Sequence, residues 1–200
     1  MVSKIVAYIH KKDSKYSEEQ LEVIQYGLEG IYILITKSIV IFTVAYLLGM
    51  IKEVLIFTLL YNIIRMPSFG LHATKSWMCY LSSLIIFLIL PYVCKTITFD
   101  PLWKGILGAI SIILIYKNAP ADTVKRPIID QKRRRNYKII STIIAITFAF
   151  LSITIKNNFL SNAFVFAIVL QNFMISPYIY QLFHLPYDNY KSYLAESVTV

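Results

Sequence analysis

The chain has 200 residues, of which 57% are hydrophobic and only 16% are charged, and its mean hydropathy is +0.61. This composition is too apolar for an ordinary soluble domain and predicts an integral membrane protein. The apolar residues form blocks separated by short charged or Pro- and Gly-bearing stretches, which favours a helix bundle over a barrel of alternating strands. We therefore expect an all-α integral membrane protein with a single membrane domain over residues 1–200, and no nucleic-acid partner.

Residues 1–30 are predicted to form a cytoplasmic arm. Residues 1–16 are basic and polar. A helix is expected to begin at Ser17, because Ser17 and Gln20 have the spacing of a capping box. The apolar residues that follow share one face, which predicts an amphipathic helix on the membrane or on the bundle. Two glycines would then lead the chain into the first span.

A helical bundle is predicted over residues 31–180. Its six apolar runs are 31–50, 54–64, 77–93, 105–116, 139–155 and 159–180. The long polar stretch 117–138 is predicted to be a basic loop outside the bilayer. The tail 181–200 has little periodicity, and we assign it no fixed structure.

Two of these runs depart from a simple span. The first carries Lys37 in its interior, and such a charge either faces protein or water, or snorkels to the interface. The second has eleven residues, too few to cross a bilayer unaided. We therefore expect a broken or re-entrant segment around 54–76, interrupted at Pro67 and Gly70.

The lysines and arginines predict the orientation. With the N-terminus inside and the runs alternating, fifteen of the twenty lie on inner segments, four lie on outer segments, and Lys37 lies in a span. This bias predicts that both termini are cytoplasmic. The reducing cytoplasm would keep Cys79 as a free thiol.

His72 and Cys79 contain the minimum parts of a cysteine hydrolase or acyltransferase, because a thiolate is the nucleophile and an imidazole can withdraw its proton. On one continuous helix they would lie about 10 Å apart along the axis, too far for a hydrogen bond. A bend at Pro67 and Gly70, with a new helix beginning just before Trp77, would let His72 fold back over Cys79. The helix dipole would then favour the thiolate form. The simpler interpretation is a packing cysteine and a histidine that anchors the chain at the interface.

Cys79 and Cys94 are not expected to form a disulfide. Fifteen residues of helix separate them by about 22 Å, whereas a disulfide needs Cα atoms within about 7 Å. Two cysteines without close metal-ligand neighbours also predict no zinc site. We expect neither a metal nor another cofactor.

Two segments of the chain carry a recognisable pattern of residue types and spacing. The first contains Arg65, Gly70, His72, Ala73, Ser76, Cys79 and Ser83. The second is NAPADTVKRP, residues 118–127, an Ala-Pro-Ala-Asp-Thr loop followed by basic residues. Together with the layout of the whole chain, they resemble the accessory gene regulator protein B (AgrB) family of bacterial quorum-sensing membrane peptidases. The sequence departs from the family pattern at Phe69, where the family more often has glycine.

The resemblance implies a multi-pass cysteine endopeptidase of the bacterial cell membrane. It would cleave the C-terminal tail of an AgrD-type precursor peptide through a thioester on Cys79, with His72 as general base. The held peptide would then cyclise to a thiolactone or lactone signal for quorum sensing. Four residues would support this site: Arg65, Gly70, Ser76 and Ser83.

The partners that the resemblance implies are the AgrD-type precursor and membrane lipids. A basic cytoplasmic surface would attract the acidic tail of the precursor. A homodimer would enclose a dry site that a small bundle with short spans leaves open. The candidates for the basic surface are Arg65, Lys125, Arg126, Lys132, Arg133, Arg134 and Arg135.

Two questions stay open at the level of sequence. The group that orients His72 has only two weak candidates, Ser76 and Asp122. The competing interpretation of the whole chain is a non-catalytic membrane protein, such as a small transporter or a signalling partner protein, in which Lys37 and the basic loop matter and Cys79 does not.

Overall fold

A computed structural model describes residues 17–71, 76–123, 127–191 and 193 of the chain. The described residues form helices and no β-strand, so the expected all-α class is confirmed. The helices are α2 (Glu18–Leu47), α3 (Ile51–Ser68), α4 (Ser76–Thr96), α5 (Pro101–Asn118), α6 (Gln131–Thr154), α7 (Asn158–Ile175) and the short α8 (Pro177–Leu182).

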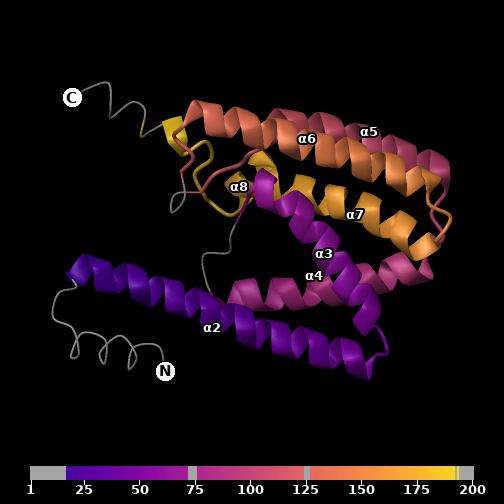
Figure 1. Cartoon of the computed structure of the whole chain (residues 1–200), viewed down its shortest axis with the longest axis horizontal. Coiled ribbons are helices and arrows are strands. Elements are labelled where there is room, and N and C mark those ends of the chain that lie inside the picture. The colour runs from indigo at the N-terminus through magenta and orange to yellow at the C-terminus, as the bar shows by residue number, and fades with distance from the viewer. Residues whose placement is uncertain (1–16, 72–75, 124–126, 192, 194–200) are drawn as a thin grey trace.

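Helices α2 to α7 run alternately between the two ends of the bundle (Figure 1). Helix α7 is central: it contacts α3, α4, α5 and α6, and it carries the largest share of buried residues. Four helices of the described chain, α2, α4, α6 and α7, are long and apolar enough to cross a membrane. Many large apolar side chains face outward, as expected for a protein surrounded by lipid.

Helix α2 begins where the sequence predicts. The Ser17 hydroxyl accepts a hydrogen bond from the Gln20 backbone amide (3.3 Å), and the Gln20 side chain accepts one from the Ser17 amide (3.0 Å), so the capping box is confirmed. Helix α2 continues through Gly27 and Gly30, so the predicted amphipathic helix and the first predicted span form one helix. A glycine costs a helix only about 1 kcal/mol. The predicted basic arm, residues 1–16, lies outside the described residues.

The predicted interruption of the second run is correct in one place and wrong in another. Helix α3 is continuous from Ile51 to Ser68, with Pro67 in its last turn, so it is not a re-entrant segment broken at Pro67. The chain does break immediately afterwards, because Phe69 (φ 56°) and Gly70 (φ 110°) leave the helical region. The next helix begins at Ser76. The segment 65–83 is therefore not one helix. The catalytic interpretation requires such a break, because on one helix His72 could not reach Cys79.

The predicted loop over 117–138 is too long. Helix α5 continues to Asn118, and α6 begins at Gln131, where the Asp130 carboxylate accepts a hydrogen bond from the backbone amide of Lys132 (2.8 Å). The basic run thus forms the first turns of α6 instead of a loop. Lysine and arginine are good helix formers, and a capping aspartate in front of them is enough to start the helix.

The prediction of no fixed structure beyond Gln181 is also wrong for the described part of the tail. Helix α8 continues to Leu182, and the chain then folds back, with the Tyr187 hydroxyl donating a hydrogen bond to the Asn118 carbonyl (3.3 Å). The contacts of this segment are with residues far away in the sequence. Local periodicity therefore carried no sign of them.

Candidate functional site

The Arg65 side chain is hydrogen-bonded to the loop that leads to His72. One guanidinium nitrogen, Nη2, donates hydrogen bonds to the carbonyls of Gly70 (3.2 Å) and Leu71 (2.5 Å). The other, Nη1, is buried and has no hydrogen-bond acceptor among the described residues. Arg65 therefore faces inward onto this loop, apart from the exposed basic surface with which the sequence grouped it.

The two segments that carry the family resemblance meet at this loop. The Gly70 amide donates a hydrogen bond to the Ala121 carbonyl (2.8 Å), and the Ala121 amide donates one to the Ser68 carbonyl (3.1 Å). Phe69 and Ala121 form an isolated parallel bridge. The end of α3 and the loop after α5 are thus tied together by their backbones.

Helix α7 supplies a third support for the loop. The Met174 carbonyl accepts a hydrogen bond from the Leu71 amide (2.8 Å), and the Gln171 side-chain amide donates one to the Phe69 carbonyl (2.9 Å). Gln171 is fully buried. The sequence analysis did not select either residue, since an amide inside an apolar run gives no local indication of its partner.

Asp122 fixes the second segment to the C-terminal part of the chain. Its carboxylate has no solvent exposure and accepts hydrogen bonds from the backbone amides of Asn189 (3.1 Å) and Tyr190 (3.0 Å). It also accepts from the amide of Ile128 and from the Arg134 guanidinium, each at 3.4 Å. Both carboxylate oxygens are occupied by these donors, so the geometry shows Asp122 as an anchor for the loop.

Two tyrosines, the buried Tyr180 and the half-buried Tyr187, complete this anchor. The Tyr180 hydroxyl donates to the Asp122 carbonyl (3.2 Å), and the Tyr187 hydroxyl donates to the Asn118 carbonyl. Burial raises the pKa of Tyr187 to about 12 and also raises the pKa of Tyr180. Both hydroxyls therefore keep their protons, and remain donors, at physiological pH.

Cys79 lies in the first turn of α4, as the sequence predicts, and is half-buried. Cys94 is fully buried near the other end of the same helix, and both thiols are free, so the predicted absence of a disulfide is confirmed. Ser76 is the first residue of α4. His72 lies outside the described residues, and its geometry relative to Cys79 stays a prediction.

Lys37 faces the protein, in line with one of the two interpretations of its charge. Its ammonium donates a hydrogen bond to the Ser83 hydroxyl (3.2 Å) across the contact between α2 and α4. Ser83 lies one helical turn beyond Cys79 and is almost completely buried. Lys37 and Ser83 are thus in contact between α2 and α4, one helical turn from the predicted nucleophile Cys79.

The predicted basic surface divides into two parts. Arg134 turns inward, with its guanidinium 3.6 Å from the centroid of the Tyr190 ring and bound to Asp122. The exposed part stands on the first turns of α6 and consists of Lys132, Arg133 and Arg135. Lys125 and Arg126 lie outside the described residues.

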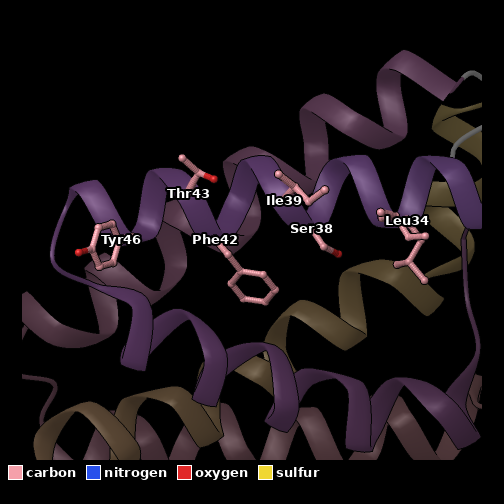
Figure 2. Close-up of a pocket in the computed structure, with 7 residues that line it drawn as sticks. Leu34, Ser38, Ile39, Phe42, Thr43 and Tyr46 are labelled. Carbon is pink, nitrogen blue, oxygen red and sulfur yellow. The ribbon is translucent and has the colours of Figure 1, made fainter.

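Two hollows on the described surface are lined by residues other than Cys79. The larger one, about 690 Å³, runs along α2 and is lined by residues of that helix alone, among them Leu34, Phe42 and Tyr46 (Figure 2). A second, about 320 Å³, lies between α4 and α7 and is almost wholly apolar. The described residues also contain no group of three histidine, cysteine or acidic side chains that could hold a metal ion.

Phe69 has a backbone conformation that suits glycine (φ 56°, ψ −134°). We expect Phe69→Gly to be more stable than Phe69→Ala by about 1 kcal/mol, because only glycine relieves the strain, while both variants lose the ring contact with Tyr137. Thermal unfolding in detergent measures the difference. At the exposed helical position Phe150 the ordinary order, alanine above glycine, is expected. If the alanine variant is more stable than the glycine variant at position 69 as well, the backbone at Phe69 is not strained.

Comparison with known proteins gives a consistent result. The family model described as accessory gene regulator B matches residues 2–175. An AgrB-like protein of Listeria monocytogenes serovar 1/2a is 31% identical over 187 residues, which cover 92% of this chain and 91% of the relative. The accessory gene regulator protein B of Staphylococcus aureus strain Newman is 32% identical over 160 residues, or 79% of this chain and 82% of the relative. No solved structure matches the chain.

Proposed function

The chain belongs to the accessory gene regulator B family, and from this premise we propose that it is a membrane cysteine endopeptidase that matures an AgrD-type precursor peptide. Its broader role is that of a membrane protein in the accessory gene regulator system of quorum sensing. One observation carries the proposal. The described parts of the two family-like segments are hydrogen-bonded to each other, at the loop that leads directly into His72.

In the proposed reaction Cys79 is the nucleophile and His72 is the general base. The thiolate attacks the carbonyl carbon at the C-terminal boundary of the signal, and a C–S bond forms. The C–N bond then breaks, and the protonated His72 gives its proton to the departing amine of the tail. The signal part of the precursor stays on Cys79 as a thioester.

The second step releases the signal as a ring. An internal cysteine or serine of the peptide attacks the thioester carbonyl, and the Cys79 thiolate leaves, giving a thiolactone or a lactone. Exchange of one thioester for another is nearly isoenergetic, so hydrolysis must be excluded. The half-buried position of Cys79 in the first turn of a helix that enters the membrane supports such exclusion.

The acidic tail of the precursor would bind the exposed basic residues at the start of α6. Lys132, Arg133 and Arg135 stand on the same helical end, where the macrodipole adds positive potential. Lys125 and Arg126 belong to the same proposed surface. The proposed supporting residues of the site are Arg65, Gly70, Ser76 and Ser83. Gly70 lies in the loop before His72, and Arg65 donates hydrogen bonds to that loop.

We also propose that this end of a single six-span membrane domain is cytoplasmic, together with both termini. The excess of lysine and arginine on the segments at this end supports the orientation. In a chain whose native cysteines are replaced by alanine, a thiol label that cannot cross the membrane should reach Lys156→Cys from outside and miss Ile129→Cys. Labelling of position 129 from outside would overturn the orientation.

The experiment that tests the activity is cleavage of the precursor in cells that express both proteins. Cys79→Ala and His72→Ala are each expected to abolish release of the tail, whereas Cys94→Ala, the matched change of the buried thiol, should retain it. Undiminished cleavage by both site variants would overturn the peptidase. It would leave the non-catalytic interpretation, a transporter or a signalling partner.

A further inference from the structure

Lys37 is a charge inside a membrane-spanning helix that the proposed mechanism has not used. A charged side chain inside a span is costly to insert into a membrane, which makes it a candidate for function. In α2 the Lys37 ammonium faces α4. It is bound 3.2 Å from the hydroxyl of Ser83 on α4.

This ammonium has no anionic partner in the part of the chain that the structure describes. The three ion pairs there join other residues: Glu53 with Lys95, Asp122 with Arg134, and Asp188 with Lys191. Ser83 offers only a neutral hydroxyl and is only 9% exposed. A cation held in this way attracts any negative charge that arises close to it.

In the proposed reaction, the residue at which such a negative charge arises is Cys79. Ser83 follows Cys79 by four residues in α4, so both side chains lie on one helical face, with Cβ atoms about 5–6 Å apart. The bond to Ser83 therefore holds the Lys37 ammonium about one helical turn from the thiol. No other lysine or arginine contacts this face of α4 through a hydrogen bond or ion pair among the described residues.

We propose that Lys37, positioned by Ser83, supplies the fixed positive charge that stabilises the anion formed at Cys79 during acyl transfer. This inference rests on the proposed peptidase function. When the Cys79 sulfur attacks, its C–S bond forms as the carbonyl π electrons move to oxygen, and the negative charge passes from sulfur to that oxygen. When the C=O bond re-forms, the C–N bond breaks and His72 supplies the proton. Lys37 neither gives nor takes a proton, and its contribution is electrostatic.

The test measures the electrostatic potential at Cys79 directly. In a Cys94→Ala background, the full chain reacts with two methanethiosulfonate reagents of similar size, one carrying a sulfonate and one a trimethylammonium group. Both need the same thiolate, so the ratio of their rates reports local charge and cancels thiol reactivity. Lys37→Gln is expected to lower the sulfonate-to-ammonium ratio about tenfold or more. Lys37→Arg should keep the ratio within about twofold of its parent.

The matched control is Lys52→Gln, which also removes one lysine. Lys52 is exposed at the start of α3, at the end of the bundle where Glu53 pairs with Lys95. Its ratio should equal that of the parent. Ser83→Ala, which keeps the charge and removes its anchor, should give an intermediate ratio. An unchanged ratio in Lys37→Gln would overturn the proposal, whether or not the variant cleaves.

Kinetics of precursor cleavage give a second, independent readout. Lys37→Gln should lower kcat about tenfold or more with KM changed less than twofold, and Lys37→Arg should restore kcat, because charge stabilises the transition state and not the bound substrate. Equal kcat in Lys37→Gln and the parent would overturn the proposal. Cleavage by Cys79→Ala would instead overturn the peptidase function itself, so the two failures are distinguishable.

Discussion

Asp122→Ala is expected to lower the free energy of unfolding by about 3–5 kcal/mol, the cost of removing one partner from a buried, hydrogen-bonded ion pair. The carboxylate is completely buried, and the change leaves the Arg134 guanidinium without its counter-charge. It also removes the hydrogen bonds that the Asp122 carboxylate accepts from the backbone amides of Asn189 and Tyr190. Thermal unfolding of the purified protein in detergent should show a melting temperature lowered by about 10 °C.

A matched control separates this effect from the loss of any aspartate. Asp100 is an exposed N-cap of α5, and its carboxylate accepts one hydrogen bond, from the Leu102 amide (2.7 Å). Asp100→Ala should therefore cost only about 1 kcal/mol. Asp122→Asn keeps one acceptor oxygen and loses the charge, so its loss of unfolding free energy should lie between those of Asp122→Ala and Asp100→Ala. A melting temperature of Asp122→Ala equal to that of Asp100→Ala would show that the anchor is not formed.

Gly70→Ala is expected to reduce precursor cleavage about 100-fold, because it displaces the loop that leads to His72. Gly70 has φ 110°, a region that side chains rarely adopt. A Cβ atom there would lie 2.5 Å from the Met174 carbonyl oxygen and 2.6 Å from the Arg65 guanidinium. The carbonyl belongs to the backbone of α7 and cannot move aside, so the loop must. Misplacement of a catalytic group by about 1 Å is enough for a loss of this size.

The control for Gly70→Ala is Gly30→Ala in α2, where a Cβ atom meets nothing within 4 Å. It should leave cleavage unchanged and stabilise the helix by up to about 1 kcal/mol. Cleavage rates in membranes, normalised to the amount of protein, measure both variants. Parental activity in Gly70→Ala would mean that this loop does not position His72.

The features that sequence could predict are those set by neighbouring residues. The Ser17 capping box and the break after α3 each depend on a few adjacent side chains or on a glycine, and local chemistry decides them. The start of α6 was missed for a related reason. A dense basic run was interpreted as a loop, although Asp130 caps a helix in front of it.

The supports of the candidate site could not be predicted, because their partners are distant in the sequence. Nothing near Asp122 indicates that it binds amides 67 and 68 positions away. Gln171 reads as one amide within an apolar helix until its bond to the Phe69 carbonyl is seen. Lys37 was recognised as exceptional for its charge, but its position beside Ser83 required the packing of α2 on α4.

The attachment of the C-terminal segment to Asp122 has a consequence for biosynthesis. The Phe69 carbonyl must wait for Gln171, made 102 residues later, and Asp122 must wait for the amides of Asn189 and Tyr190. A chain still emerging from the ribosome can form its early helices, but the loop before His72 lacks its bonds to Gln171 and Met174 until α7 has been made. Under the proposed function, we therefore expect nascent chains to be inactive, so that a precursor peptide made at the same time is processed only by completed chains.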